Sequence, residues 1–229
     1  MMDADNPYEP ELAPDDWGEH AGQDEENVNK TGTTTVGIAT DDGVVIATDR
    51  RASLAGRFVS NKQVVKVEEI HPTAAMTLVG SVGGAQSFIS SLRAEVNLYE
   101  ARRGEEMSMK ALSTLAGNFA RGGPYFAINP ILGGVDDEGS HVFSIDPAGG
   151  VMKDDYTVTG SGMQVAYGFL EQAWHEDIDM GEAKTAAARA VVSAAERDTG
   201  SGNGLVLAEV TADGVEITEY DEFPDPDEV

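Results

Sequence analysis

The pattern of hydrophobic and polar residues divides the chain into an irregular leader and a regularly patterned remainder. Residues 1–30 contain three prolines and many acidic residues but little hydrophobic periodicity, so we expect this leader to be disordered. Apolar and β-branched residues then fill 36–40 and 44–48, on either side of Asp41-Asp42-Gly43. Two such runs around an Asp-Gly turn predict a β-hairpin.

The later elements follow in clusters. Short β-rich runs predict strands at 58–59, 64–67, 74–79, 125–134, 141–146, 150–152, 156–159, 205–210 and 215–220. Apolar residues at helical spacing predict helices over 85–103, from 108, after Gly160-Ser161-Gly162, and over 183–197. The last of these is rich in alanine, so we expect it to pack closely against its neighbours. The acidic tail, residues 221–229, is expected to be disordered.

This order of elements indicates the fold class. Strands, two helices, strands, two helices and strands follow one another, which favours an α+β fold over alternating βαβ units. Two antiparallel sheets packed face to face, with a helix pair outside each, would bury every amphipathic face. The sequence therefore predicts a four-layer αββα sandwich.

Composition and charge narrow the possible functions. The chain has 41 acidic and 15 basic residues, a net charge of −26, which would repel nucleic acid and anionic membranes. An acidic surface adapted to high intracellular salt is the interpretation we favour over cation binding, because no calcium-loop motif is present. There is no cysteine, no apolar run long enough to span a membrane and no secretory signal. We expect a cytoplasmic protein.

Most familiar catalytic motifs are absent from the sequence. It contains no phosphate-binding loop, zinc-binding His-Glu-x-x-His helix or Gly-x-Ser-x-Gly elbow. The four histidines lack metal-ligand spacing and are expected on the surface or in loops; they are His20, His71, His141 and His175. Residues 200–204 are rich in glycine, but a strand and not a helix is predicted to follow them, which disfavours a phosphate site.

One threonine is a candidate catalytic nucleophile. Thr33 follows Gly32 where the patterned region begins. If the bond between them is cut, Thr33 carries a hydroxyl and a free α-amine with an ordinary pKa of about 7.7–8.0. One residue would then supply both the nucleophile and its general base. The alternative is that a threonine-rich segment simply begins a β-strand.

Several segments together resemble one known family. They are Thr33-Thr34-Thr35-Val36-Gly37, Ala47-Thr48-Asp49-Arg50-Arg51, Lys66-Val67, Gly80-Ser81-Val82-Gly83, Phe143 to Gly150, Gly160-Ser161-Gly162, and Arg197-Asp198 with Ser201-Gly202. In these segments, over about residues 32–220, the chain resembles the archaeal 20S proteasome β subunit, an N-terminal-nucleophile hydrolase. The acidity resembles that of a haloarchaeal member.

The resemblance implies a role for particular residues. Thr33 matches the catalytic threonine, which the subunit itself frees by cutting the Gly32–Thr33 bond. Lys66 matches the lysine beside the threonine hydroxyl, and Asp49 matches the acid that pairs with this lysine. Gly80 matches the backbone N–H donor to the oxyanion.

The resemblance also extends to a group around the threonine amine and to a specificity pocket. The group around the amine comprises Ser161, Asp198 and Ser201, with Arg51 as a structural neighbour. The pocket would be lined by Ala52, Val64, Leu78 and Val82. All four are apolar, which indicates cleavage after large hydrophobic residues, although each would also suit an ordinary core. The spacing before Lys66 leaves a one-residue offset open for Val64.

The function implied is that of a cofactor-free threonine endopeptidase that degrades unfolded polypeptides. Residues 1–32 would be a propeptide, 33–220 the catalytic domain and 221–229 an acidic tail. By resemblance, β subunits form heptameric rings stacked between rings of α subunits, fed by an ATP-driven unfoldase. The alternatives are the related bacterial ring protease, which also begins Thr-Thr, and a non-catalytic structural ring subunit. The Gly-Ser-Gly and Arg-Asp segments disfavour the first, and intact Thr33, Asp49 and Lys66 disfavour the second.

Overall fold

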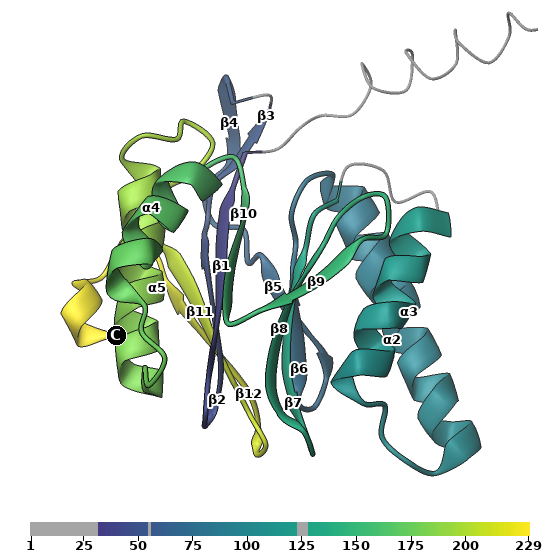
Figure 1. Ribbon diagram of the computed structural model, residues 1–229. Coiled ribbons are helices and arrows are strands. Elements are labelled where there is room, and N and C mark those ends of the chain that lie inside the picture. Colours follow the sequence, from purple (N-terminus) through teal and green to yellow (C-terminus); the bar gives the residue numbers. More distant parts are fainter. Residues whose placement is uncertain (1–31, 55, 123–127) are drawn as a thin grey trace, which may run out of the picture.

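The computed structural model describes residues 32–54, 56–122 and 128–229 and has the predicted layered architecture. Two five-stranded antiparallel sheets pack face to face between two helix pairs (Figure 1). The first sheet has the order β10 (Tyr156–Gly160), β1 (Thr34–Thr40), β2 (Gly43–Asp49), β11 (Leu205–Thr211) and β12 (Gly214–Tyr220). The second has the order β5 (Val67–His71), β6 (Ala74–Thr77), β7 (Ile131–Asp136), β8 (Gly139–Ile145) and β9 (Val151–Asp154).

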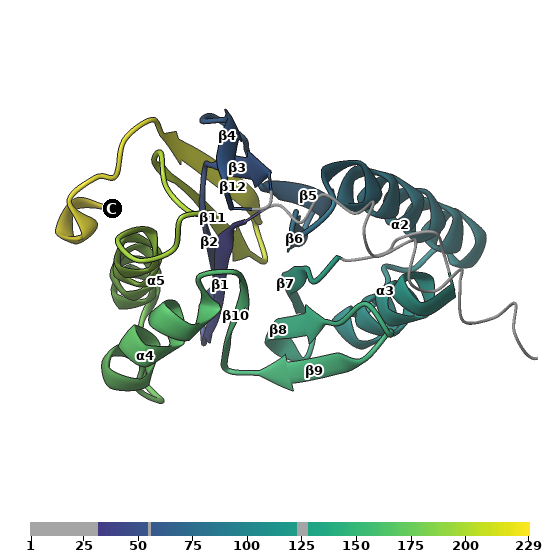
Figure 2. The ribbon, with the colours of Figure 1, turned by 90° about the horizontal axis from the view of Figure 1, so that it is seen from above.

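The helices cover the outer faces of the sheets. Figure 2 shows, from above, α4 (Met163–Ala173) and α5 (Met180–Ala195) beside the first sheet. On the opposite side, α2 (Val82–Arg103) and α3 (Met109–Gly122) cover the second. The predicted four-layer αββα sandwich is thus confirmed. A separate hairpin of β3 (Ala52–Leu54) and β4 (Phe58–Asn61) stands at one end of the sheets (Figure 1).

The predicted first hairpin places the start of β1 beside the end of β2. Thr40 pairs with Gly43 across the turn, and Thr35 pairs with Thr48 at the far end. Because the strands are antiparallel and of equal length, the residue before β1, Thr33, lies close to Asp49. The hairpin register alone therefore brings two of the predicted site residues to the same edge of the first sheet.

The two sheets approach so closely that glycine is required between them. A Cβ atom on Gly133 of β7 would lie 2.8 Å from Cγ1 of Val44 and 3.0 Å from Cδ1 of Ile46. These side chains belong to a fully buried cluster between the sheets, which also contains Val142 and Val206. The close packing holds the sheets rigidly, so the ends of their strands form a fixed platform.

The alanine-rich helix α5 packs closely on the first sheet, as predicted. Its buried face includes Ala183, Ala187, Ala190 and Ala194, each fully buried. The helix begins at Met180, three residues earlier than expected. The reason is a capping box in which Asp179 accepts from the Glu182 amide while the Glu182 carboxylate accepts from the Asp179 amide.

The C-terminal tail differs from the expectation of disorder. Residues 226–228 form a short 3₁₀ helix, η1 (Pro226–Glu228), that lies against α5. Phe223 and Val229 pack against the cluster beneath α4 and α5, and the Asp227 carboxylate contacts Arg189. These two apolar residues and the ion pair together attach the acidic segment to the helix pair. Within the described residues, no helix combines the length and apolarity that a membrane crossing requires.

Two histidines expected on the surface or in loops are in fact buried in the second sheet. His71 ends β5 and is 8% exposed, with Nε2 3.0 Å from the Glu100 carboxylate. His141 on β8 is 5% exposed, with Nε2 2.8 Å from Asp136 Oδ1. Carboxylate partners make burial of these polar rings possible. His175 is about half exposed, as expected, and His20 lies outside the described residues.

Several strand boundaries also differ from the prediction. The segment 64–66 is not a strand, because β5 begins only at Val67, and the segment 128–130 precedes β7. Residues 123–127 lie outside the described residues. In 64–66 the backbone instead bonds outside the sheet, since the Val64 amide donates to the Arg50 carbonyl over 3.0 Å. This irregular segment carries Lys66.

The carboxylate of Asp136 connects the end of β7 to the start of α3. One oxygen accepts from the Met109 amide at 2.7 Å, and the other accepts from the Glu138 amide at 2.9 Å and contacts His141. Burial raises the pKa of the Asp136 carboxyl, but these hydrogen bonds outweigh burial, so the pKa lies below its ordinary value. The charged form is therefore the one that the fold stabilises.

Asp136→Ala should reduce the free energy of unfolding at pH 7 by about 1.5–3 kcal/mol, because three contacts to a charged acceptor are lost. The folded-state pKa is depressed, so this contribution is present above the ordinary carboxyl pKa of about 3.9 and is lost as pH falls through the folded-state value. Urea denaturation of the full chain at constant salt, from pH 7 to pH 2, measures both effects.

Asp137→Ala is the matched control, because Asp137 is an exposed acid in the same turn. It should cost less than about 0.5 kcal/mol. Equal losses for the two variants would contradict the assignment, as would an Asp136→Ala loss of the same size at pH 2.

Candidate active site

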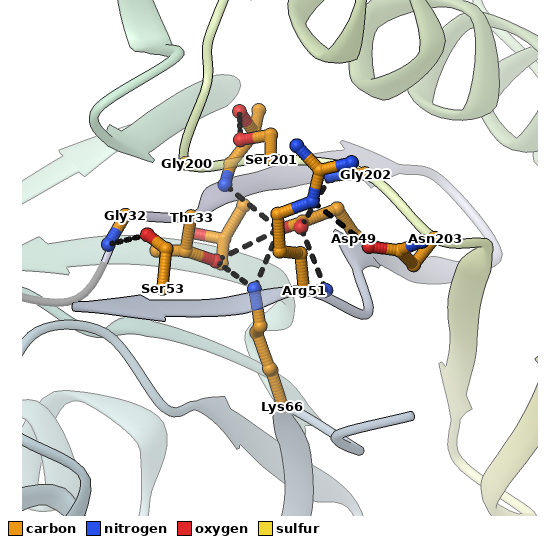
Figure 3. A network of polar contacts seen from close by, with 12 residues as sticks. Gly32, Thr33, Asp49, Arg51, Ser53, Lys66, Gly200, Ser201, Gly202 and Asn203 are labelled. Carbon is orange, nitrogen blue, oxygen red and sulfur yellow. Dashed lines mark hydrogen bonds and ion pairs between the residues drawn. The ribbon is translucent and has the colours of Figure 1, made fainter. Parts of the chain in front are cut away.

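Thr33 lies immediately before β1 in a buried network of charged groups. The residue is 2% exposed. The hydroxyl Oγ1 accepts a hydrogen bond from Lys66 Nζ at 2.7 Å and donates one to Asp49 Oδ1 at 3.0 Å (Figure 3). In this chain the Thr33 nitrogen is the amide of the Gly32–Thr33 bond, so it carries no basic lone pair.

Asp49 is the centre of this network. It ends β2, is fully buried, and forms an ion pair with Lys66 over 2.7 Å. Its Oδ1 also accepts from the Thr34 amide at 3.0 Å. Its Oδ2 accepts from the amides of Arg51 at 3.0 Å and Gly202 at 2.8 Å. A buried carboxylate with one cation and three backbone donors is fully satisfied, so its charge is stabilised without water.

Lys66 reaches this centre from the irregular segment before β5. The residue is 4% exposed. Burial lowers the pKa of the Lys66 ammonium below its ordinary value, while the adjacent Asp49 carboxylate opposes the shift. The ammonium therefore releases a proton at a lower pH than a free lysine would, and it does so in contact with a hydroxyl. Such a shifted amine beside a nucleophile is typical of catalytic sites.

A chain of hydroxyl groups lies on the other side of Thr33. The Thr33 amide donates to Ser161 Oγ at 3.1 Å, and Ser161 Oγ donates to Asp198 Oδ2 at 2.6 Å. Ser201 Oγ donates to the same Asp198 oxygen at 2.6 Å and lies 2.7 Å from Thr34 Oγ1. The structure thus brings together the three residues expected around the threonine nitrogen. They come from the ends of β10 and α5 and the loop before β11.

Arg51 holds that loop in place, as the sequence suggests for a structural partner. Its Nε donates to Asn203 Oδ1 at 2.8 Å, and its guanidinium also donates to the Thr199 carbonyl at 3.0 Å. Asn203 has a φ of 66°, a left-handed conformation that few residues other than glycine adopt. The side-chain contact with Arg51 stabilises this turn, which in turn presents the Gly202 amide to Asp49 (Figure 3).

Gly80 lies at the end of the second sheet that faces this network. Its φ of 92° is in the region that favours glycine, and it forms an isolated bridge with Ile128. Both Gly80 and Thr33 border one cleft. This placement suits a backbone donor near the threonine hydroxyl; its role towards an oxyanion stays a prediction.

The cleft beside Thr33 has a volume of about 80 Å³ and is bordered by five apolar side chains, together with two glycines and five polar or charged residues. All four residues expected to line a pocket border it, namely Ala52, Val64, Leu78 and Val82. Val64, which the one-residue offset left open, borders the cleft, and so does the next residue, Val65.

Two polar residues of the cleft were missed in the sequence. Glu68 lies two positions after Lys66, and Gln86 lies four positions after Val82. Lys66 precedes β5, and Val82 precedes the helix predicted from residue 85, so neither strand nor helix periodicity in the sequence identifies these two residues.

Fold and site together define a class. A four-layer αββα sandwich with a threonine before its first central strand, held against a buried lysine and aspartate, is typical of N-terminal-nucleophile hydrolases. A family model described as "Proteasome subunit" matches residues 29–210. The chain therefore belongs to the proteasome subunit family.

Related proteins agree with this assignment. The chain is 75% identical over 216 residues to "Proteasome subunit beta 1" of Haloarcula marismortui, covering 94% of this chain and 89% of that protein. It is 72% identical over 223 residues to "Proteasome subunit beta" of Natrialba magadii, covering 97% and 92% of the two chains. The resemblance to haloarchaeal proteasome β subunits seen in the sequence is thus confirmed.

Asp49→Ala should destabilise the chain more than Lys66→Met. Removing the carboxylate leaves a buried ammonium and three backbone N–H groups without their acceptor, a loss of about 3–5 kcal/mol. Removing the ammonium leaves a carboxylate that still accepts from the amides of Thr34, Arg51 and Gly202, so the loss should be at least about 1.5 kcal/mol smaller. Urea denaturation of the full-length variants measures the difference.

The partly exposed ion pair between Lys184 and Glu209, 3.1 Å apart, provides the control. Glu209→Ala and Lys184→Met should each reduce the free energy of unfolding by less than about 1 kcal/mol. If Asp49→Ala and Lys66→Met prove equally destabilising, Asp49 does not have the central role described for it.

Proposed function

We propose that this chain is the precursor of a threonine endopeptidase of the 20S proteasome core, and that it removes residues 1–32 by cutting the Gly32–Thr33 bond. The position of Thr33 Oγ1, 2.7 Å from Lys66 Nζ and 3.0 Å from Asp49 Oδ1, carries the proposal. A buried hydroxyl in contact with an amine of lowered pKa is an activated nucleophile.

Self-processing would begin with attack of Thr33 Oγ1 on the carbonyl carbon of Gly32. Because the Thr33 nitrogen is still an amide, the neutral form of Lys66, which burial favours, would take the hydroxyl proton and pass it to the nitrogen of the breaking C–N bond. As the C–N bond breaks, the nitrogen takes up a proton and an ester links Gly32 to Thr33. Water then hydrolyses the ester, which leaves a carboxylate on residues 1–32 and restores the hydroxyl.

Peptide hydrolysis follows the same path with the new α-amine as the base. The amine takes the Thr33 hydroxyl proton, and the alkoxide attacks the substrate carbonyl. The amine then gives the proton to the substrate nitrogen as the peptide C–N bond breaks, so the first product leaves and an ester acyl-enzyme remains. Ser161, Asp198 and Ser201 hold the amine and relay the proton. The Gly80 N–H stabilises the oxyanion, a contribution that is typically about 2.7–4 kcal/mol for one donor. Water releases the second product.

The apolar cleft supports cleavage after large hydrophobic residues of unfolded polypeptides, since its lining includes Ala52, Leu78 and Val82. The relatives are named as proteasome subunits, so we propose the assembly of that family for this chain. It comprises heptameric β rings between rings of α subunits, with an ATP-driven unfoldase acting through the α rings in the cytoplasm. Residues 33–220 would be the catalytic domain and 221–229 a tail packed on α5.

Thr33→Ala should abolish both leader removal and peptidase activity, because it removes the only group proposed to attack a carbonyl. Intact-mass measurement and N-terminal sequencing of assembled particles should find Thr33 first in the wild type and Met1 or Met2 in the variant. Thr40→Ala, at the other end of β1, removes a hydroxyl that contacts only the turn and is the control. Wild-type particles that keep the leader would favour the non-catalytic alternative.

Assembled rings should dissociate at low ionic strength. Without residues 1–32 the chain still has 31 acidic and 14 basic residues, a net charge of −17, so subunits repel one another. The Debye length grows from about 3 Å at 1 M salt to about 10 Å at 0.1 M. Sedimentation velocity in a series from about 3 M to 0.1 M NaCl measures the loss of the large particle. Sucrose in place of salt is the control and should not restore it. If the particles keep their size over the whole salt series, the hypothesis that the acidic surface is adapted to high salt is wrong.

A further inference from the structure

Ser53 makes a contact that the mechanism above does not use. It lies on β3, is 1% exposed, and its Oγ accepts a hydrogen bond from the Gly32 amide at 3.1 Å (Figure 3). This amide belongs to the residue on the leader side of the scissile bond, whose carbonyl carbon is the proposed point of attack. The serine therefore contacts the leader junction without contacting either atom of the bond to be broken.

Gly200 confines the same residue from the opposite side. A Cβ atom on Gly32 would collide with Gly200 Cα and would lie 2.9 Å from Ser53 Oγ. A Cβ atom on Gly200 would lie 2.9 Å from Ser161 Oγ and would press on Gly32. The junction is thus enclosed between the β3–β4 hairpin and the loop before β11, in a space that fits only glycine.

Gly32 differs from an ordinary substrate residue in how it can be held. A large hydrophobic residue would be anchored by its side chain in the cleft bordered by Ala52, Val64, Leu78 and Val82. Gly32 has no side chain for the cleft to bind, so its position depends on its backbone contacts. Among the described residues, the observed side-chain acceptor for the Gly32 amide is the Ser53 hydroxyl.

We infer that Ser53 is a positioning residue for self-processing, selective for the leader junction over peptide substrates. This inference rests on the proposed function. By holding the Gly32 amide, Ser53 limits rotation about the backbone bonds of Gly32. The Gly32 carbonyl carbon therefore stays within reach of Thr33 Oγ1. Once the bond is cut, Gly32 departs and this hydrogen bond no longer exists in the mature subunit.

The test compares two rates in Ser53→Ala. Full-length variant and wild type are assembled with their partner subunits at high salt, and leader removal is followed by intact mass. Leader removal should be about tenfold slower, the factor that corresponds to one lost hydrogen bond. After processing is complete, turnover per Thr33 terminus of a peptide cleaved after a large hydrophobic residue should change less than about twofold.

Two further variants separate positioning from damage to the fold. Ser53→Thr keeps the hydroxyl and should restore the rate of leader removal. Ser60→Ala removes a hydroxyl from β4 of the same hairpin that contacts only the Ala52 carbonyl, and it should leave both rates unchanged. Thermal unfolding and particle size of each variant report on folding and assembly.

The outcomes distinguish this inference from the proposed function. Wild-type chains that never lose the leader overturn the proposed function. Wild-type chains that are processed while Ser53→Ala is processed at the same rate overturn only the role of Ser53. Equal slowing of processing and peptide turnover also overturns it, because Ser53 would then hold any bound backbone. Failure of Ser53→Thr to restore the rate would assign the effect to packing.

Discussion

The site depends on the burial of the Asp49 carboxylate. This group is fully buried, and it is stabilised by one ammonium and by backbone amides from three separate parts of the chain. Removal of a carboxylate from water is costly unless such partners are in place before the charge is buried. The fold therefore has to bring β1, β2 and the loop before β11 together accurately. This placement of the segments also positions the Thr33 hydroxyl against Lys66. Burial lowers the pKa of the Lys66 ammonium, while the Asp49 carboxylate opposes that shift.

The same constraint explains why the site is made of strand ends and not of one motif. The rigid double sheet supplies the platform, and the groups that contact Thr33 project from its edges: Lys66 from the segment before β5, and Ser161 from the end of β10. The close approach of the Gly32 and Gly200 backbones leaves Gly32 little conformational freedom. Under the proposed function, precursor and mature enzyme would share one set of groups, while contacts to Gly32 itself would belong to the precursor alone.

The acidic character of the chain is a property of its surface and has little influence on the site. The buried charges are paired: Lys66 with Asp49, and Arg50, 4% exposed, with Glu219 and Asp221. Net charge affects association and solubility and does not specify a fold. This separation lets a strongly charged exterior coexist with a buried network of charges around Thr33 whose electrostatics are local.

Local sequence determined the elements that depend on near neighbours. The Asp-Gly turn and its flanking β-rich runs predicted the hairpin of β1 and β2, and the clustering of strands and helices predicted four layers. Thr33, Asp49 and Lys66 were identified by resemblance at positions that the structure brings into contact.

The remaining features of the site were decided only by the tertiary structure. Ser53, Glu68, Gln86 and Gly200 carry no local signal for a site, since each becomes relevant through a partner in another element. The tail was misjudged because its attachment depends on two apolar residues meeting a distant helix. The spacing of residues along the chain shows which of them are neighbours within one strand or helix. A buried site depends instead on which strand ends and loops the packed sheets bring together.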